Sequence, residues 1–496
     1  MIFNSFSFIY FFFIVLTILG LERLFSKNVI LRNLTLLLAS YFFYGSFNWW
    51  FLILLIYITL LNYFAGVLIH KRKYPPSLSI YNLQSEVVPS RWRFRGSSKT
   101  IVGITIVLSL LPLIFFKYTL FFIKSFSSLL SFELNTEFIE GLLLPVGISF
   151  FTFQALSYVI DLYRGKVEYC KSLLNFALFV SFFPTILSGP IEKARELLPQ
   201  IKKYCFPSGD DLLQGFCIFI WGLFKKIVIA DRLANYVDWA YESNQYESGS
   251  TLAVAAVFYS IQIYCDFSGY SDMALGVAKA LGFNITKNFR QPYLSRTIKE
   301  FWRKWHIALT TWFTEYVYFS LGGSRVSAKW KWIRNISLVF VLSGIWHGAA
   351  WSFLIWGGLH AVYYLGEYYL GFQKQDFKWN IWNSTIGGVI VFFLVTIAWI
   401  FFRVTNLNET WHIIVKIFSD WSVPFSMGAS SFTFAVTIVC LIIFIIYEFV
   451  VRLGLLSFDT KFNGRNLTYN IIFSIPLLIM IGLCSRSADT FVYFQF

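Results

Sequence analysis

The sequence predicts an all-α protein that crosses a membrane many times. Of its 496 residues, 57% are hydrophobic and only 14% are charged, whereas soluble domains carry about 25% charged residues. The apolar runs are continuous instead of alternating, which excludes a β-barrel. At about 20 residues per span, we expect about ten to twelve transmembrane and re-entrant helices. They should form one integral-membrane domain over residues 1–496.

Three apolar segments at 6–20, 34–44 and 49–69 predict the first three helices. No basic residue precedes the first segment and no small-residue cleavage site follows it, so we expect a retained helix instead of a signal peptide. A basic loop at 70–99 comes next. Because basic loops mark the cytoplasmic side, counting back three crossings places the N-terminus outside.

The next part of the chain contains three segments with apolar or amphipathic periodicity, at 101–116, 117–140 and 142–160. A further helix is predicted at 173–187, but Pro184 and Gly189-Pro190 should break it within the membrane or at its edge. Such breaks are tolerated where the backbone lines a cavity.

Residues 210–238 alternate apolar positions with Lys225, Lys226, Asp231 and Arg232. This pattern is too polar for a span that faces lipid. We therefore expect an interfacial or re-entrant helix there.

Two carboxylates, Asp266 and Asp272, lie inside the otherwise apolar segment 250–282. They are candidates to orient a catalytic base or to form structural ion pairs, and ion pairing is the favoured interpretation because buried charges need partners. The candidate partners are basic residues that follow in the chain: Arg290, Arg296 and Arg303.

The remaining apolar segments predict helices at 310–321, 336–365, 389–402, 432–451 and 471–484. A second basic loop lies at 325–334, and Arg452, Lys461 and Arg465 mark the inside. One more crossing then places the aromatic tail at 485–496 outside the membrane.

His347 is the leading candidate for chemistry, because it interrupts an apolar run between Trp346 and Gly348. An ionisable side chain at membrane depth is costly and is therefore a functional hypothesis by default. A neutral imidazole suits general-base catalysis. His306, which follows Trp305, is a second candidate with a catalytic or substrate-orienting role. His360 should lie almost on the opposite face of an unbroken helix, so we expect it to share a site with His347 only if that helix breaks.

Several functions are excluded by composition. The net charge of +15 indicates membrane topology and not nucleic-acid binding. The six cysteines show no Cys-x-x-Cys spacing and the five histidines are far apart, so we expect neither a disulfide framework nor a metal site.

The sequence resembles the membrane-bound O-acyltransferase (MBOAT) family, and within it the bacterial alginate and peptidoglycan O-acetyltransferase branch. The motifs that carry the resemblance include 145–150, Gly189-Pro190, 266–272, Phe301-Trp302 through Trp305-His306, Leu321-Gly322-Gly323, Trp346-His347-Gly348, Trp399 through Arg403, and 491–494. The resemblance implies a helical bundle around a central funnel and tunnel. It also implies that His347 is the membrane-embedded histidine of the family and His306 its second motif histidine.

The resemblance implies a reaction as well. An acyl group leaves a cytoplasmic thioester, expected to be acetyl-CoA, without a bound cofactor. It then reaches an extracytoplasmic cell-wall polymer or exopolysaccharide through a partner that is an SGNH-hydrolase-like acetyltransferase. Tyr493, in the aromatic tail, is similar to a tyrosine implicated as an acyl acceptor in the related D-alanylation system. We expect the protein in the bacterial inner membrane, among membrane lipids.

In this interpretation His347 is the general base, and Trp305, His306 and Trp346 shape a tunnel that excludes water. The other residues expected to line the tunnel or bind substrate are Trp302, Arg303, Asp266 and Asp272. The donor phosphates would bind basic residues, namely Arg303, Lys304 and Arg325. Three alternatives stay open: transfer of D-alanine or another acyl group from a carrier protein, a lipid acyltransferase with a long-chain donor, and a non-catalytic acyl or glycan transporter.

Overall fold

The computed structural model describes residues 1–73, 95–130, 143–373, 380–428, 430–452 and 464–484, and these ranges contain helices and no strand. Within them, seven helices are long and apolar enough to cross a membrane: Phe6–Phe25, Phe51–Arg72, Ser98–Ser127, Gly209–Glu242, Gly249–Ala280, Ile381–Arg403 and Ser431–Arg452. The prediction of an all-α, multi-pass membrane protein is confirmed.

The chain forms two compact units, one of residues 1–208 with 281–285 and one of residues 209–280 with 286–496. The single domain predicted over residues 1–496 and the central tunnel stay predictions.

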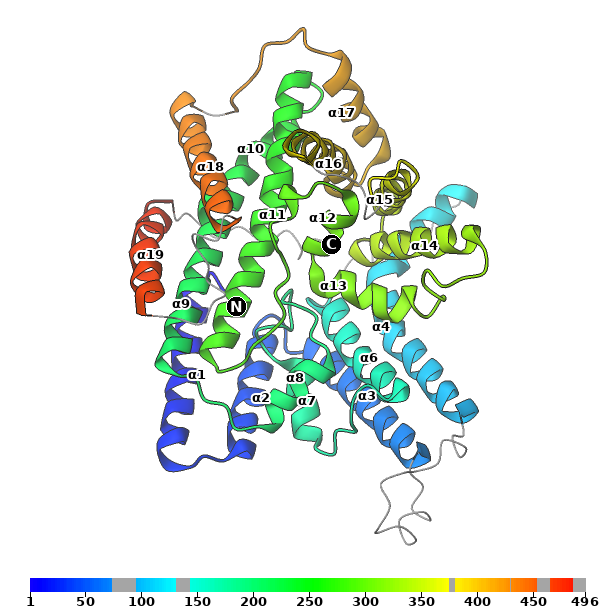
Figure 1. The fold of residues 1–496 in the computed structure, drawn as a ribbon, viewed down its shortest axis with the longest axis vertical. Coiled ribbons are helices and arrows are strands. Elements are labelled where there is room, and N and C mark those ends of the chain that lie inside the picture. Colours follow the sequence, from blue (N-terminus) through cyan, green and yellow to red (C-terminus); the bar gives the residue numbers. More distant parts are fainter. Residues whose placement is uncertain (74–94, 131–142, 374–379, 429, 453–463, 485–496) are drawn as a thin grey trace. The chain divides into compact units, whose positions relative to one another are not determined.

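The first unit is a helical bundle (Figure 1). Its described helices are α1 (Phe6–Phe25), α2 (Val29–Gly45), α3 (Phe51–Lys73), α4 (Arg95–Leu130), α6 (Ile148–Arg164), α7 (Leu173–Ser181) and α8 (Ala194–Lys202). Helix α3 packs against α4 and α6, and α2 packs against α7. Side-chain caps fix two starts, since Ser5 and Asn28 accept hydrogen bonds from the first turns of α1 and α2.

The basic loop predicted at 70–99 is helical at both ends, because α3 continues to Lys73 and α4 begins at Arg95. The rest of the loop, 74–94, lies outside the described residues. Helix α4 also joins the segments predicted separately at 101–116 and 117–140, as far as residue 130. It contains Pro112, which a membrane helix tolerates when neighbouring groups satisfy the backbone.

The helix predicted at 173–187 does break, as Pro184 and Gly189-Pro190 indicated: α7 ends at Ser181, and a buried segment without regular helix follows at 182–193. Gln154 of α6 satisfies part of this exposed backbone. Its amide nitrogen donates to the Phe179 carbonyl, and its amide oxygen accepts from the Glu192 N–H at 3.2 Å. A buried polar side chain thus supports irregular backbone that water does not reach.

The second unit contains α9 (Gly209–Phe224), the π-helical turn η3 (Lys225–Ala230), α10 (Asp231–Glu242), α11 (Gly249–Ala280), η4 (Pro292–Leu294), α12 (Ile298–Lys304), α13 (Ile307–Trp312), η5 (Phe313–Tyr318), α14 (Lys329–His347), α15 (Trp351–Tyr369), α16 (Ile381–Arg403), α17 (Leu407–Ser419), α18 (Ser431–Arg452) and α19 (Gly464–Cys484). Helix α11 is central, because it packs against α9, α10, α16 and α17 (Figure 1).

The prediction of an interfacial or re-entrant helix at 210–238 is wrong. Helix α9 continues through η3 into α10, and the run from Gly209 to Glu242 has the length and hydropathy of a membrane span. Its most apolar window is 67% buried inside the protein, so its charged residues need not face lipid. Lys225 and Lys226 are buried among carboxylates of the same unit, which explains how such a polar helix is stable.

The single helix predicted at 336–365 is two helices. Helix α14 ends at His347, α15 begins at Trp351, and the two pack against each other. Two glycines permit this close packing: a Cβ at Gly344 would lie 2.2 Å from the Phe353 carbonyl oxygen, and one at Gly357 would lie 2.4 Å from that of Phe340. The break places His347 at a helix end against α15.

Candidate functional site

His306 joins α12 to α13 in a strained backbone conformation. Its φ of 42° and ψ of 57° lie in the left-handed region, which a residue other than glycine seldom adopts. Two backbone hydrogen bonds hold this turn: the Arg290 N–H donates to the Lys304 carbonyl at 3.0 Å, and the Ile307 N–H donates to the Asn288 carbonyl at 2.8 Å. Such strain is found where a structure holds a functional side chain in place.

Asn288 determines which nitrogen of His306 carries the proton. The amide oxygen of Asn288 accepts the Ala308 N–H at 3.2 Å, and its amide nitrogen lies 3.3 Å from the Ser271 hydroxyl. A backbone N–H only donates, so this amide oxygen is also the group 3.1 Å from His306 Nδ1. Nδ1 must therefore donate, and the lone pair of the neutral ring lies on Nε2.

The surroundings of His306 favour its neutral form. The side chain is 1% exposed, and burial lowers the pKa of His306 to about 3. The Phe267 ring packs edge-on at 4.6 Å between centroids, and the Phe289 ring stacks at 6.4 Å. A neutral imidazole in this apolar site can accept a proton or a hydrogen bond at Nε2.

The structure brings both predicted histidines into one aromatic cluster. The Trp346 ring lies 6.1 Å from the His306 ring and 4.9 Å from the His347 ring, centroid to centroid. His347 is 4% exposed, and it packs edge-on against Trp356 at 5.1 Å and Phe402 at 5.2 Å. His306 and His347, which lie far apart in the sequence, thus contact the same tryptophan in the structure.

His360 also belongs to this cluster, because the helix break on which that outcome was predicted to depend is present. The chain breaks between α14 and α15, so the periodicity of one helix does not apply. The Trp356 ring lies 4.9 Å from the His360 ring and 5.1 Å from the His347 ring. The indole of Trp302 donates to His360 Nδ1 at 3.3 Å, which places the His360 proton on Nε2.

Trp305, which is predicted to line the tunnel, packs against aromatic residues that also contact His306 and His360. Its ring lies 5.1 Å from Phe289 and 4.9 Å from Trp399. The Trp399 indole donates to the Tyr293 hydroxyl at 3.1 Å, and that hydroxyl donates to the Ser260 carbonyl at 2.5 Å. Sequence reasoning assigned no role to Asn288 or Phe289, because nothing in the chain marks which residues contact His306.

The two predicted carboxylates form ion pairs, but with lysines and not with the arginines expected. Lys226 contacts Asp266 at 2.7 Å and also Asp231 at 2.7 Å. Lys225 contacts Asp272 at 2.5 Å and donates to the Ser268 hydroxyl at 2.9 Å. These pairs fix η3 to α11, which supports the structural interpretation. Any direct contact of Asp266 or Asp272 with substrate stays a prediction.

The predicted phosphate-binding residues lie at or near the surface. Arg303 and Arg325 are exposed, and Lys304 is half-buried with its amine 2.7 Å from Glu300.

Burial raises the pKa of the nearby Glu367, although the Ile298 and Lys299 N–H groups donate to its carboxylate. Tyr493, the predicted acyl acceptor, lies outside the described residues. Among the described residues, no group of three metal-ligating side chains gathers.

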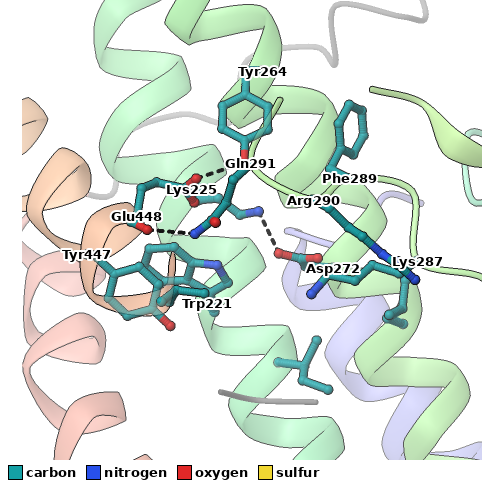
Figure 2. Close-up of a pocket in the computed structure, with 13 residues that line it drawn as sticks. Trp221, Lys225, Tyr264, Asp272, Lys287, Phe289, Arg290, Gln291, Tyr447 and Glu448 are labelled. Carbon is teal, nitrogen blue, oxygen red and sulfur yellow. Dashed lines mark hydrogen bonds and ion pairs between the residues drawn. The ribbon is translucent and has the colours of Figure 1, made fainter. Parts of the chain in front are cut away.

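A cavity of about 260 Å³ opens beside the cluster (Figure 2). Phe289 lines this cavity and also contacts the rings of His306 and Trp305. The cavity and the buried histidines are therefore separated by one aromatic side chain.

The chain is similar to known proteins over most of its length. Residues 94–411 match the family model described as the membrane-bound O-acyltransferase family. The chain is similar to the probable alginate O-acetylase of Pseudomonas aeruginosa, at 36% identity over 84% of this chain and 75% of that protein. It is also similar to the peptidoglycan O-acetyltransferase of Helicobacter pylori, at 35% identity over 78% of this chain and 73% of that protein. The teichoic acid D-alanyltransferase of Bacillus subtilis is 30% identical over 52% of this chain and 68% of that protein.

Proposed function

Because the chain belongs to the membrane-bound O-acyltransferase family and is an O-acyltransferase, we propose that it passes an acetyl group from a cytoplasmic thioester to an extracytoplasmic polysaccharide. The observation that carries this proposal is the cluster that joins His306 and His347 through Trp346. The relatives named for acetylation of alginate and peptidoglycan support a cell-wall polymer or exopolysaccharide as the final acceptor.

His347 acts as the general base on the acceptor hydroxyl. The hydroxyl oxygen bonds to the thioester carbonyl carbon, the carbon–sulfur bond breaks, and the proton taken by His347 passes to the departing thiolate. His306 is a second hydrogen-bond acceptor, and its Nε2 lone pair orients the attacking hydroxyl. Trp302, Trp305 and Trp346 keep water away from the thioester, which limits hydrolysis.

The donor is acetyl-CoA, a substrate and not a bound cofactor. Its phosphates reach the basic residues Arg303, Lys304 and Arg325, since guanidinium and ammonium groups form charge-assisted hydrogen bonds with phosphate. The protein lies in the bacterial inner membrane with both termini outside. The basic residues that flank the spans support this orientation, including Arg452 at the end of α18.

An SGNH-hydrolase-like acetyltransferase outside the membrane completes the transfer, and Tyr493 relays the acetyl group to it. The test is mass spectrometry of the C-terminal peptide after incubation with labelled acetyl-CoA. An acetylated phenol is expected, and Tyr493→Phe should abolish export of the label. Full export by Tyr493→Phe would limit the tail to anchoring or docking.

A second candidate is transfer of D-alanine or another acyl group from a carrier protein, which the similarity to a teichoic acid D-alanyltransferase favours. Reconstituted protein given labelled acetyl-CoA or an acylated carrier protein separates the two donors. Acetyl transfer without a carrier supports the acetyltransferase proposal, and transfer from the carrier alone overturns it. A non-catalytic transporter would move label without needing His347.

A further inference from the structure

One side of α15 carries three buried polar side chains, Ser352, Trp356 and His360. Each is 0% exposed, and they follow one another at intervals of four residues, which places them on one side of the helix. Helix α15 packs against α12, α14 and α16 (Figure 1). Their polar atoms must therefore find partners inside the second unit.

Within the described part of the chain, these side chains have polar atoms without a hydrogen-bond partner: the Ser352 hydroxyl, the Trp356 indole nitrogen and His360 Nε2. The indole nitrogen is a donor only. His360 Nε2 is also a donor, because Nδ1 of the same ring accepts from the Trp302 indole at 3.3 Å. Buried donors are nearly always paired, so these two N–H groups need an acceptor that the described residues do not supply.

Aromatic packing holds both N–H donors beside the proposed general base. The Trp356 ring lies 5.1 Å from the His347 ring and 4.9 Å from the His360 ring. Trp399 stacks on Trp356 at 5.7 Å, and Phe402 packs against it at 5.4 Å. The two donors are thus fixed before any substrate arrives, which is the condition for electrostatic preorganisation.

The chemistry of these donors suits a charge that develops during a reaction. Both N–H groups are neutral and lie in apolar surroundings, where a permanent anion would need a counter-charge, whereas a hydrogen bond to a transient oxyanion is strengthened. A general base and the donors to an oxyanion each lie about 3 Å from the reacting groups. Because Trp356 contacts both histidines, one carbonyl group can be served by His347 and by these donors.

We propose that Trp356 Nε1–H and His360 Nε2–H stabilise the oxyanion of the tetrahedral intermediate in acyl transfer. As the acceptor oxygen bonds to the thioester carbon, the π electrons of the carbonyl move to its oxygen, and both N–H groups donate to the O⁻ that forms. Collapse returns these electrons to the C=O bond and expels the thiolate. Ser352 is not included, because it lies about 12 Å from His360 along the helix axis.

The inference rests on the proposed function and adds two catalytic residues to His347 and His306. The test is single-turnover transfer of labelled acetyl groups from acetyl-coenzyme A by the full-length protein in liposomes, with donor affinity measured separately. Trp356→Phe removes one N–H and keeps an aromatic ring. His360→Asn keeps an acceptor for the Trp302 indole and removes the second donor.

Each of these two variants should lower the rate of transfer by about 10²–10³ without changing donor affinity, because the hydrogen bonds form only in the transition state. His360→Gln places an amide N–H near the position of Nε2 and should react faster than His360→Asn. Tyr363→Phe is the matched control, because it removes a hydroxyl from another ring that packs against His360, and it should react at the wild-type rate. Melting temperatures show that the variants compared are folded.

Replacing the carbonyl oxygen of the donor by sulfur separates oxyanion stabilisation from a loss of packing. In the dithioester analogue of acetyl-coenzyme A, the sulfur is a weak hydrogen-bond acceptor. The substitution should slow the wild type more than it slows uncatalysed transfer in water, a comparison that needs no variant. It should slow Trp356→Phe and His360→Asn less than the wild type, because each has already lost one hydrogen bond. An equal effect of sulfur in the wild type, the two variants and water would refute the proposal.

Failure of this proposal differs from failure of the proposed function. Wild-type rates in Trp356→Phe and His360→Asn, with His347→Ala inactive, would refute the oxyanion site and leave the acetyltransferase proposal intact. Absence of transfer by the wild type from any thioester would overturn both.

Discussion

Replacing Asn288 tests how the protein controls the tautomer of His306. The Asn288 side chain accepts hydrogen bonds from His306 Nδ1 and the Ala308 N–H and lies 3.3 Å from the Ser271 hydroxyl. Asn288→Leu keeps a similar volume but removes both acceptor contacts. Two buried donors then lose their acceptor, at about 1–3 kcal/mol each, so the melting temperature should fall.

Activity should fall further than stability explains. Without Asn288 the ring can place its proton on Nε2, where the lone pair is needed. Losing a positioned proton acceptor typically costs about 10²–10⁴ in rate, and we expect at least the lower value. Ser271→Ala is the matched control, because it removes the contact on the far side of Asn288 and leaves both acceptor contacts in place.

Asn288→Asp adds a readout that a purely structural role would not move. The carboxylate still accepts from Nδ1 and from the Ala308 N–H, but a nearby negative charge raises the pKa of His306, by about 1–3 units in comparable pairs. Protonated His306 is inactive, so the acidic limb of the kcat/KM profile should shift to higher pH. The assay is transfer of labelled acetyl groups from pH 4 to 8. An unchanged limb in Asn288→Asp, or wild-type activity in Asn288→Leu, would refute the tautomer assignment.

Further predictions concern packing and buried charge. Gly344→Ala should separate α14 from α15, because its Cβ would lie 2.2 Å from the Phe353 carbonyl oxygen. The melting temperature and the rate of acetyl transfer should both fall. Gly358→Ala is the control, because open space surrounds Gly358, and it should be neutral or stabilise the protein by up to about 1 kcal/mol. Lys226→Met should lower the free energy of unfolding by about 3–5 kcal/mol, since Asp266 stays buried without its cation. Adding Asp266→Asn should recover part of that loss, and no recovery in the double variant would contradict the pairing.

The helical bundle was predictable because every segment that spans lipid must satisfy its backbone hydrogen bonds internally, which a continuous apolar helix does. Continuous apolar runs, such as those that became α1, α3 and α18, need no tertiary information. The apolar pattern did not predict a membrane span from Gly209 to Glu242, because a segment that contains Lys225 and Lys226 was expected to be too polar for one. Their carboxylate partners lie on α11, and sequence spacing does not reveal a pairing between helices.

The candidate site was predictable in its residues and less so in its geometry. The sequence identified His306 and His347 as ionisable groups in apolar surroundings, and they share one aromatic cluster. Whether His360 joins them could not be decided, because periodicity applies only to an unbroken helix and the chain turns after His347. Asn288 could not be found this way, since its role depends on the left-handed turn at His306, which is a tertiary feature.

The most direct test of the account is single-turnover acetyl transfer by protein reconstituted in liposomes. His347→Ala should bind donor normally and transfer acetyl groups at least about 10² slower than the wild type, because the general base is lost. His412→Ala, which replaces an exposed histidine outside the cluster, should react at the wild-type rate. Transfer at the wild-type rate by His347→Ala, at a normal level in the membrane, would contradict the central claim.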